Sequence, residues 1–142
     1  MTDDEWLTCE NGADMLWEAY KGAKRRALTL AACEIARTVR DLIVDKKLKA
    51  LAQSCLTVAE KVAYNGDARR ASERVWEYID RCSPNEAEAD AAAASALAAQ
   101  SVSEPSDACR VSKYAAWASG DRSDAFRAHA DIVRKHIPRR PR

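Results

Sequence analysis

An alanine-rich stretch, residues 87–102, constrains the fold of this chain more than any other feature of the sequence. Leu97 is its only large apolar residue before Val102. Alanine has the highest helix propensity of the amino acids, so the stretch is predicted to be helical. Its small side chains let neighbouring helices approach closely but bury little apolar area. Because strand-forming residues are scarce along the chain, closely packed helices are expected throughout.

Apolar residues at helical spacing predict the two helices of a hairpin earlier in the chain. Residues 23–44 carry them at steps of four and three, the period of a helix with one core-facing side. The positions are Leu28, Ala32, Ile35, Val39 and Leu42. Residues 46–64 repeat the pattern, and Asn65 with Gly66 is predicted to end that helix. The short link near Asp45 makes the pair antiparallel, and we call it the basic hairpin because its first half is rich in lysine and arginine.

Capping residues predict the remaining helix boundaries. Asp67 is expected to cap a helix over residues 68–82. Ser83 and Glu86, with Pro84 between them, match the S-x-x-E capping box and are expected to open the alanine-rich helix. Two further helices are predicted, from Pro105 to a stop at Gly120 and from Asp121 to just before Pro138.

These features predict an all-α, single-domain fold, either a bundle or a short stack of helical hairpins, with about six helices. Residues 1–137 are expected to form the domain. Residues 1–22 would be an N-terminal arm with two short helical pieces, packed on the rest of the domain. Residues 138–142 are expected to be a flexible basic tail, because they have nothing to bury.

The N-terminal arm is expected to fold back onto the basic hairpin. Trp6 and Trp17 would expose a large apolar area if the arm were free, so both indoles are predicted to be largely buried. The acidic side chains of the arm would then approach Lys24, Arg25 and Arg26 and add a modest attraction that salt screens.

The cysteines and the lack of long apolar runs indicate a protein of the cytoplasm. The five cysteines are widely spread and never form C-x-x-C, which argues against a disulfide framework and a zinc knuckle. The first ten residues carry four acidic side chains and no basic one, unlike a secretory signal. No run approaches the roughly 20 apolar residues of a membrane span. A cytoplasmic location without membrane contact is therefore expected.

No arrangement of side chains predicts an enzyme. His129 and His136 share one helix face but lack a third metal ligand at a recognised spacing. Cys33 and Cys82 have arginines nearby but no histidine partner that would activate a nucleophilic thiol. The four glycines all fall at predicted turns, which leaves no phosphate-binding loop. No catalytic residue, metal or cofactor is expected, and a cysteine- or metal-dependent enzyme is kept as a third alternative.

The tryptophans are the most informative large residues, because the chain has only one phenylalanine. They lie at Trp6, Trp17, Trp76 and Trp117. Such residues either anchor the core or mark a binding surface, since tryptophan is enriched at interface hot spots. The leading hypothesis is a non-enzymatic helical interaction module that binds a protein partner, as an inhibitor, an immunity-like protein or an accessory subunit. Homodimerisation through the alanine-rich helix would be one form of it.

The alternative hypothesis is a nucleic-acid or nucleoprotein-binding accessory factor. It requires the first long helix and the last helix to adjoin, so that their basic residues line one phosphate-binding surface. These residues are Lys24, Arg25, Arg26, Arg134, Lys135, Arg139, Arg140 and Arg142. The net charge of only +1 and the acidic arm oppose this hypothesis.

The opening of the chain, MTDDEWLTC, resembles an uncharacterised family of small helical proteins that occur as paralogues in planctomycete genomes and begin M-T-E-x-E-W-L. Similar segments follow at Met15–Leu16, in the basic, cysteine-containing helix Lys24–Cys33, and in Val58–Tyr64 with the turn Asn65–Asp67. Family members often carry two adjacent cysteines where this chain has only Cys33, and they end in an aromatic tail that this chain lacks. The resemblance implies a helical fold and brings no activity with it.

A second similarity, mainly of composition, is to alanine-rich helical immunity-type proteins that neutralise a partner toxin. It implies inhibition of a protein partner as one form of the leading hypothesis. No residue is carried over from it.

Overall fold

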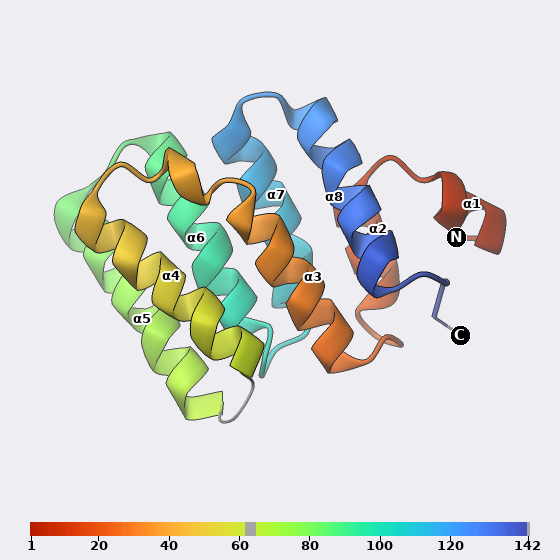
Figure 1. The fold of residues 1–142 in the computed structure, drawn as a ribbon, viewed down its shortest axis with the longest axis horizontal. Helices are drawn as coiled ribbons and strands as arrows, with labels where there is room; N and C mark the ends of the chain where they lie inside the picture. The colour runs from red at the N-terminus through yellow and green to blue at the C-terminus, as the bar shows by residue number, and fades with distance from the viewer. Residues whose placement is uncertain (62–64, 142) are drawn as a thin grey trace.

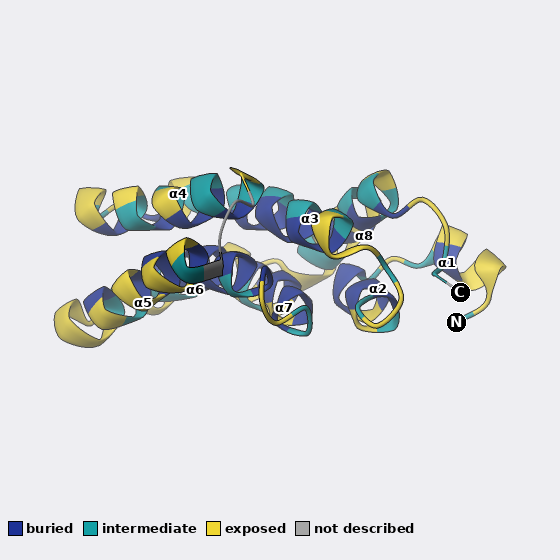
Figure 2. Cartoon of the chain, turned by 90° about the horizontal axis from the view of Figure 1, so that it is seen from below, coloured by how far each residue is buried: buried dark blue, intermediate teal, exposed yellow. Residues whose placement is uncertain are grey.

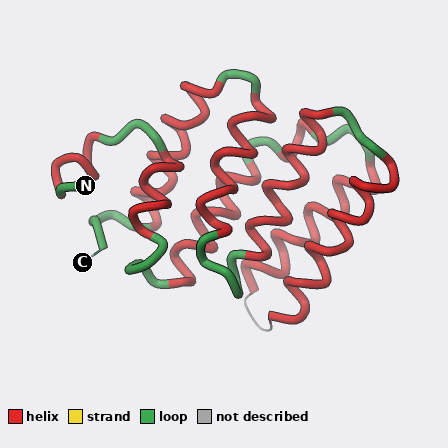
Figure 3. The backbone as a smooth tube through the Cα atoms, turned by 180° about the vertical axis from the view of Figure 1, so that it is seen from behind, coloured by secondary structure: helices red, strands yellow, loops and turns green. Residues whose placement is uncertain are grey.

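The structure, a computed structural model, describes residues 1–61 and 65–141, and all regular secondary structure in these ranges is helical (Figures 1 and 3). The helices of these ranges are α1 (Asp3–Thr8), α2 (Gly12–Ala19), α3 (Arg25–Arg37), the 3-10 turn η1 (Arg40–Leu42), α4 (Lys46–Lys61), α5 (Asn65–Cys82), α6 (Glu86–Gln100), α7 (Asp107–Ser119) and α8 (Arg122–His136). The all-α, single-domain class is confirmed. The predicted number of about six helices is too low, because both short pieces of the arm form helices of their own, α1 and α2.

The helices are arranged in two layers, which Figure 2 shows edge-on. The first layer holds α3, α4 and α8, and the second layer holds α2, α5, α6 and α7. Helices of one layer cover those of the other: α3 packs on α6 and α7, α4 on α5 and α6, and α8 on α7 and α2. The small helix α1 lies at one end, near both chain termini (Figure 1). Each layer therefore keeps one face for the core and one face for solvent.

The alanine-rich helix α6 is the central element of the packing. It contacts α5 and α7 within the second layer and α3 and α4 across the core. Every residue from 91 to 99 is buried. Alanine suits this position because only small side chains let four helices approach one axis closely. Residues 91–99 of this helix therefore offer no exposed side chain to a second copy, and homodimerisation through it stays a prediction.

The helix predicted over residues 23–44 is wrong over residues 38–44. It ends at Arg37, and the chain turns through η1 before α4 begins. The hydroxyl of Thr38 donates to the carbonyl of Ile35 at 2.6 Å, a local bond that competes with the continuing helix. Val39 is buried as expected, but the turn leaves Leu42 exposed and buries Ile43 in its place.

The boundary between α4 and α5 also differs from the prediction. Asn65 and Gly66 were expected to end a helix, yet α5 begins at Asn65. Asp67 is therefore not a cap but lies in the first turn of α5, where its negative charge favours the helix dipole. The last residues of the helix predicted over 46–64, residues 62–64, lie outside the described residues.

The start of α6 is capped two residues later than the capping box predicted. Asn85 is the cap, and its side-chain oxygen accepts from the backbone N–H of Glu88 at 2.9 Å. The carboxylate of Glu88 accepts in turn from the backbone N–H groups of Val44 at 2.6 Å and Asp45 at 2.9 Å. Glu88 thereby joins the first turn of α6 to the turn before α4. The predicted stop at Gly120, with φ +82°, and the predicted cap at Asp121 are both confirmed.

The N-terminal arm packs on α7 and α8, not on the basic hairpin. Trp6 is 1% exposed, and its indole donates to the carbonyl of Ile137 at 3.2 Å. The guanidinium of Arg134 donates to the carbonyls of Trp6 at 3.2 Å and Cys9 at 2.7 Å. The expected approach of acidic side chains to Lys24, Arg25 and Arg26 is therefore wrong. They pair with other groups: Asp3 with Arg140, Glu10 with Arg127, and Glu18 with the Met1 amine.

None of the helices in the described ranges combines the length and the apolarity that crossing a membrane requires.

Candidate protein-binding surface

The structure separates the four tryptophans into one core residue and three surface residues. Trp6 is buried, whereas Trp17 is 64% exposed, Trp117 is 43% exposed and Trp76 is half-buried. The predicted burial of Trp17 is wrong because α2 buries the opposite side, with Met15, Leu16 and Ala19. Trp17, Trp76 and Trp117 belong to α2, α5 and α7, which are all helices of the second layer.

Trp17 lies beside a small hollow at the boundary between α2 and α7. Residues of both helices line it: Ala13, Asp14 and Trp17 from α2 with Cys109 and Lys113 from α7. Its volume is about 270 Å³. The ring of Tyr20 lies 5.2 Å from the Trp17 indole, and the Lys21 ammonium lies 5.6 Å from the centre of the Tyr20 ring. The indole is therefore held in place by an aromatic neighbour while one side stays open to solvent.

Trp117 lines a larger groove between the start of α6 and the end of α7. The groove has a volume of about 740 Å³. Its lining includes Glu86 and Asp90 of α6, Tyr114 and Trp117 of α7, and Arg122 at the start of α8. The rings of Tyr114 and Trp117 are 5.1 Å apart and tilted by 58°. Partial burial, followed by the charge of Glu86, raises the pKa of Asp90 above its usual range.

Trp76 is anchored at the other end of α6. Its indole donates to the side-chain oxygen of Gln100 at 2.7 Å, and the amide of Gln100 donates to the carboxylate of Asp107 at 3.3 Å. Partial burial raises the pKa of Asp107, although Arg110 lies nearby and opposes the shift. This chain of hydrogen bonds joins α5, α6 and α7, so Trp76 has a role in packing as well as a partly open face.

The outward side of α7 connects the Trp17 hollow with the Trp117 groove. Four side chains of α7 are spaced three, one and three residues apart, so they share one side of the helix. They are Arg110, Lys113, Tyr114 and Trp117. We call the surface formed by Trp17, Lys113, Tyr114 and Trp117 the aromatic face. Sequence reasoning missed Tyr114, although its spacing of three residues from Trp117 places both rings on the same side of a helix.

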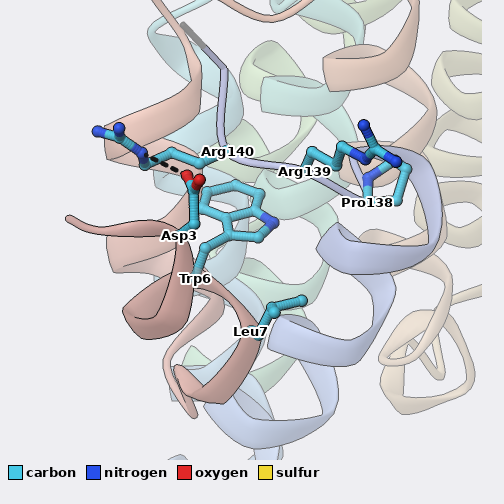
Figure 4. Close-up of a pocket in the computed structure, with 6 residues that line it drawn as sticks. All are labelled: Asp3, Trp6, Leu7, Pro138, Arg139 and Arg140. Atoms are coloured by element: carbon cyan, nitrogen blue, oxygen red, sulfur yellow. Dashed lines mark hydrogen bonds and ion pairs between the residues drawn. The ribbon is translucent and has the colours of Figure 1, made fainter.

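A further groove lies where the two chain ends meet, and Figure 4 shows its lining. It is formed by Asp3, Trp6 and Leu7 of α1 with Pro138, Arg139 and Arg140 of the tail, and its volume is about 670 Å³. Arg140 pairs with Asp3 at 3.2 Å, whereas the side chain of Arg139 points away from that pair (Figure 4). The groove depends on the contact between the two termini, which closes it on one side.

The basic residues of the nucleic-acid hypothesis are divided between internal contacts and solvent. Helices α3 and α8 do pack together, as that hypothesis requires. Arg134 binds backbone carbonyls of the arm, and Lys135 pairs with Glu34 at 2.8 Å, which lowers the Glu34 pKa. Arg26 donates to the carbonyl of Ala59 at 3.4 Å, and Arg140 pairs with Asp3. Lys24, Arg25 and Arg139 are exposed, and Arg142 lies outside the described residues.

Three of the cysteines and one of the two histidines occupy buried packing positions. Burial raises the pKa of Cys33 to about 11, of Cys55 to about 12 and of Cys109 to about 11, and a thiol that stays protonated is a poor nucleophile. Cys82 is exposed. His129 is buried against Ser112, whereas His136 bonds Glu34 at 3.2 Å. Within the described residues, no group of three or more histidine, cysteine or acidic side chains is placed to hold a metal ion.

Comparisons of the chain with protein-family models, curated proteins and solved structures find no match. The resemblance to the planctomycete family therefore stays a prediction, and any function has to be argued from the surfaces described above.

Proposed function

We propose that this chain is a non-enzymatic helical interaction module that binds a protein partner through the aromatic face. The observation that supports this proposal is the exposure of Trp17 and Trp117, at 64% and 43%, on adjacent helices of one layer. Covering an exposed indole is worth on the order of 1–3 kcal/mol by its apolar area. Tryptophan and tyrosine are also the residues that most often carry the binding energy of protein interfaces.

The geometry of the aromatic face suits a protein more than a small molecule. The Trp17 hollow and the Trp117 groove lie on either side of the exposed ridge of α7 and are both open to solvent. A small ligand binds best in a concave site that surrounds it, whereas a protein surface covers a ridge and its two flanks. Lys113 and Arg110 supply charges around the rings, the arrangement of an apolar centre with a polar rim. An inhibitor, an immunity-like protein or an accessory subunit could use such a surface.

The test is capture of the partner from native cells by immobilised protein. The Trp17→Ala/Trp117→Ala double variant removes both exposed indoles. The matched control is the Leu42→Ala/Val44→Ala double variant, which removes two exposed apolar side chains at the opposite layer, around η1. We expect the control to retain the partner and the tryptophan variant to lose it. With the purified partner, the loss should be at least about tenfold in Kd, which corresponds to about 1.4 kcal/mol.

Two outcomes would contradict the proposal. One is a partner that the tryptophan variant and the control retain equally well. The other is a protein that stays strictly monomeric by size-exclusion chromatography with light scattering and retains nothing from native cells.

The alternative proposal is a nucleic-acid-binding accessory factor, and it rests on the packing of α3 against α8. Lys24, Arg25 and Arg139 would contact phosphate, because the described residues show no internal partner for them. Binding to DNA or RNA should then weaken steeply between low and physiological salt as counterions are released. Absence of binding to single- and double-stranded DNA and RNA at low salt would eliminate this alternative.

A further inference from the structure

We propose that the Trp117 groove binds an arginine side chain of the protein partner. This inference rests on the proposed function and adds the chemistry of the residue that the partner inserts. The site combines two aromatic rings from α7 with two carboxylates from α6, which is the combination that recognises a guanidinium.

The rings supply a surface for a cation. The rings of Tyr114 and Trp117 pack against each other, with their centroids 5.1 Å apart and their planes tilted by 58°. A cation over the face of an indole is attracted by the negative face of its π system, and tryptophan is the strongest such partner. Trp117 is 43% exposed, which leaves part of its ring available to a ligand.

The carboxylates supply the charge. Glu86 and Asp90 are one helical turn apart and both line the groove. Helix α6 carries no basic residue that would neutralise them. Arg122 is the one cation among the lining residues, and no ion pair joins it to Glu86 or Asp90 in the described part of the chain. Partial burial, followed by the neighbouring Glu86, raises the pKa of Asp90, because both disfavour its charged form. An added cation would favour that form.

Arginine fits this site better than lysine. Its planar guanidinium can lie flat on the Trp117 indole while its N–H groups point outward in the same plane. Those donors can reach two carboxylate groups at once, and Glu86 with Asp90 presents two on one side of a helix. A lysine ammonium is a point charge that is more strongly hydrated, so it gains less from the ring.

The experiment uses the indole N–H signals of the ¹⁵N-labelled full chain. Trp6 and Trp76 donate to Ile137 and Gln100, whereas Trp17 and Trp117 are the exposed indoles, so the four signals report on distinct environments. The probe is the peptide acetyl-Gly-Arg-Gly-amide. The matched control peptide carries citrulline, which has the shape of arginine without its charge, and a lysine peptide is the second control.

We expect the arginine peptide to shift the Trp117 indole signal and the Gly120 amide signal saturably and to leave Trp17 unmoved. The citrulline peptide should bind at least about tenfold more weakly, because it loses the cation–π and ionic contributions. Asp90→Asn should weaken binding several-fold, and Arg122→Gln should strengthen it by removing the competing cation. Trp117→Phe should retain more binding than Trp117→Leu. Asp124→Asn, which changes an exposed carboxylate paired with Arg127, is the control that should change nothing.

Equal responses to the arginine and citrulline peptides, or an arginine response that Asp90→Asn leaves intact, would overturn this inference. Its failure is separable from failure of the proposed function. If no arginine response is seen but partner capture still depends on Trp17 and Trp117, only the arginine assignment is wrong. The groove could also bind arginine as expected while the Trp17→Ala/Trp117→Ala variant captures the same proteins as the Leu42→Ala/Val44→Ala control. In that case the aromatic face is not the surface that binds the partner.

Discussion

The hydroxyl of Ser112 lies 2.7 Å from Nδ1 of His129, and this pair joins α7 to α8 inside the core. His129 is 1% exposed, so its imidazole is removed from water on folding. Burial lowers its pKa from 6.5 to about 4, because the low-dielectric surroundings disfavour the charged ring. The histidine is therefore a neutral packing residue at neutral pH, and its protonation opposes folding.

This pair predicts a loss of stability in mild acid. Between the unfolded pKa of 6.5 and the folded pKa of about 4, the unfolded chain binds one proton more than the folded chain. The free energy of unfolding should therefore fall as the pH falls through this window, by about 2 kcal/mol between pH 7 and pH 5. Urea denaturation at both pH values measures it. His129→Gln should reduce this difference, and an equal difference in the variant would assign the effect to other groups.

The contrast between Trp6 and Trp17 predicts that the same substitution destabilises the protein strongly at one position and weakly at the other. Trp6→Ala removes a buried indole and its hydrogen bond to Ile137, so the free energy of unfolding should fall by about 3–5 kcal/mol. Trp17→Ala changes an indole that is 64% exposed, and it should cost less than about 1 kcal/mol. Denaturant titrations of the two variants measure both values.

A milder variant keeps this prediction testable if Trp6→Ala does not fold. Trp6→Phe retains a ring but loses the donor to Ile137, and it should still cost more than Trp17→Ala. Similar costs for the substitutions at both positions would mean that the arm is not part of the folded domain. The cost at Trp6 should also persist at high salt, because it comes from the burial of the indole and not from an ion pair.

Local signals in the sequence predicted the features that depend on few residues. Gly120 ends α7 with φ +82° and Asp121 caps α8, because a left-handed stop and a cap are set by the residue itself and its next neighbours. The apolar positions Leu28 and Ile35 are buried as their helical spacing predicted. The all-α class follows from the same periodicity and from the alanine-rich stretch.

Contacts between distant segments could not be predicted in the same way. Trp6 and Trp17 look alike in sequence, but Trp6 is buried where α1 meets the end of α8, whereas Trp17 lies on the side of α2 that faces away from the core. A Cβ at Gly12 would lie 2.4 Å from the Cβ of His129, so this glycine allows α2 to approach α8 closely, and no sequence pattern marked it. The Trp117 groove joins residues from α6, α7 and the start of α8. It could be recognised only after the two layers were known.

Replacing Glu88 should destabilise the protein more than replacing a carboxylate that is exposed on the surface. Its carboxylate accepts from the backbone N–H groups of Val44 and Asp45. Glu88→Ala leaves these two donors without that acceptor and should lower the free energy of unfolding by about 1–3 kcal/mol. Glu86→Ala, two residues earlier in the same turn, is the matched control and should cost only a few tenths of a kcal/mol through the helix dipole. Equal costs in thermal or urea unfolding would show that Glu88 does not hold the turn.

The close packing around α6 predicts that its buried positions tolerate only small side chains. Ala96 is fully buried where α6 meets its neighbouring helices, whereas Ala87 in the first turn of the same helix is exposed. Ala96→Leu would force neighbouring helices apart and should cost about 1–3 kcal/mol, although leucine is a good helix former. Ala87→Leu makes the same chemical change in open surroundings and should be close to neutral. Because residues 91–99 of α6 are buried within their own chain, Ala96→Leu should lower the melting temperature by the same amount at every protein concentration. A loss that shrinks as the concentration rises would instead place Ala96 at an interface between two copies.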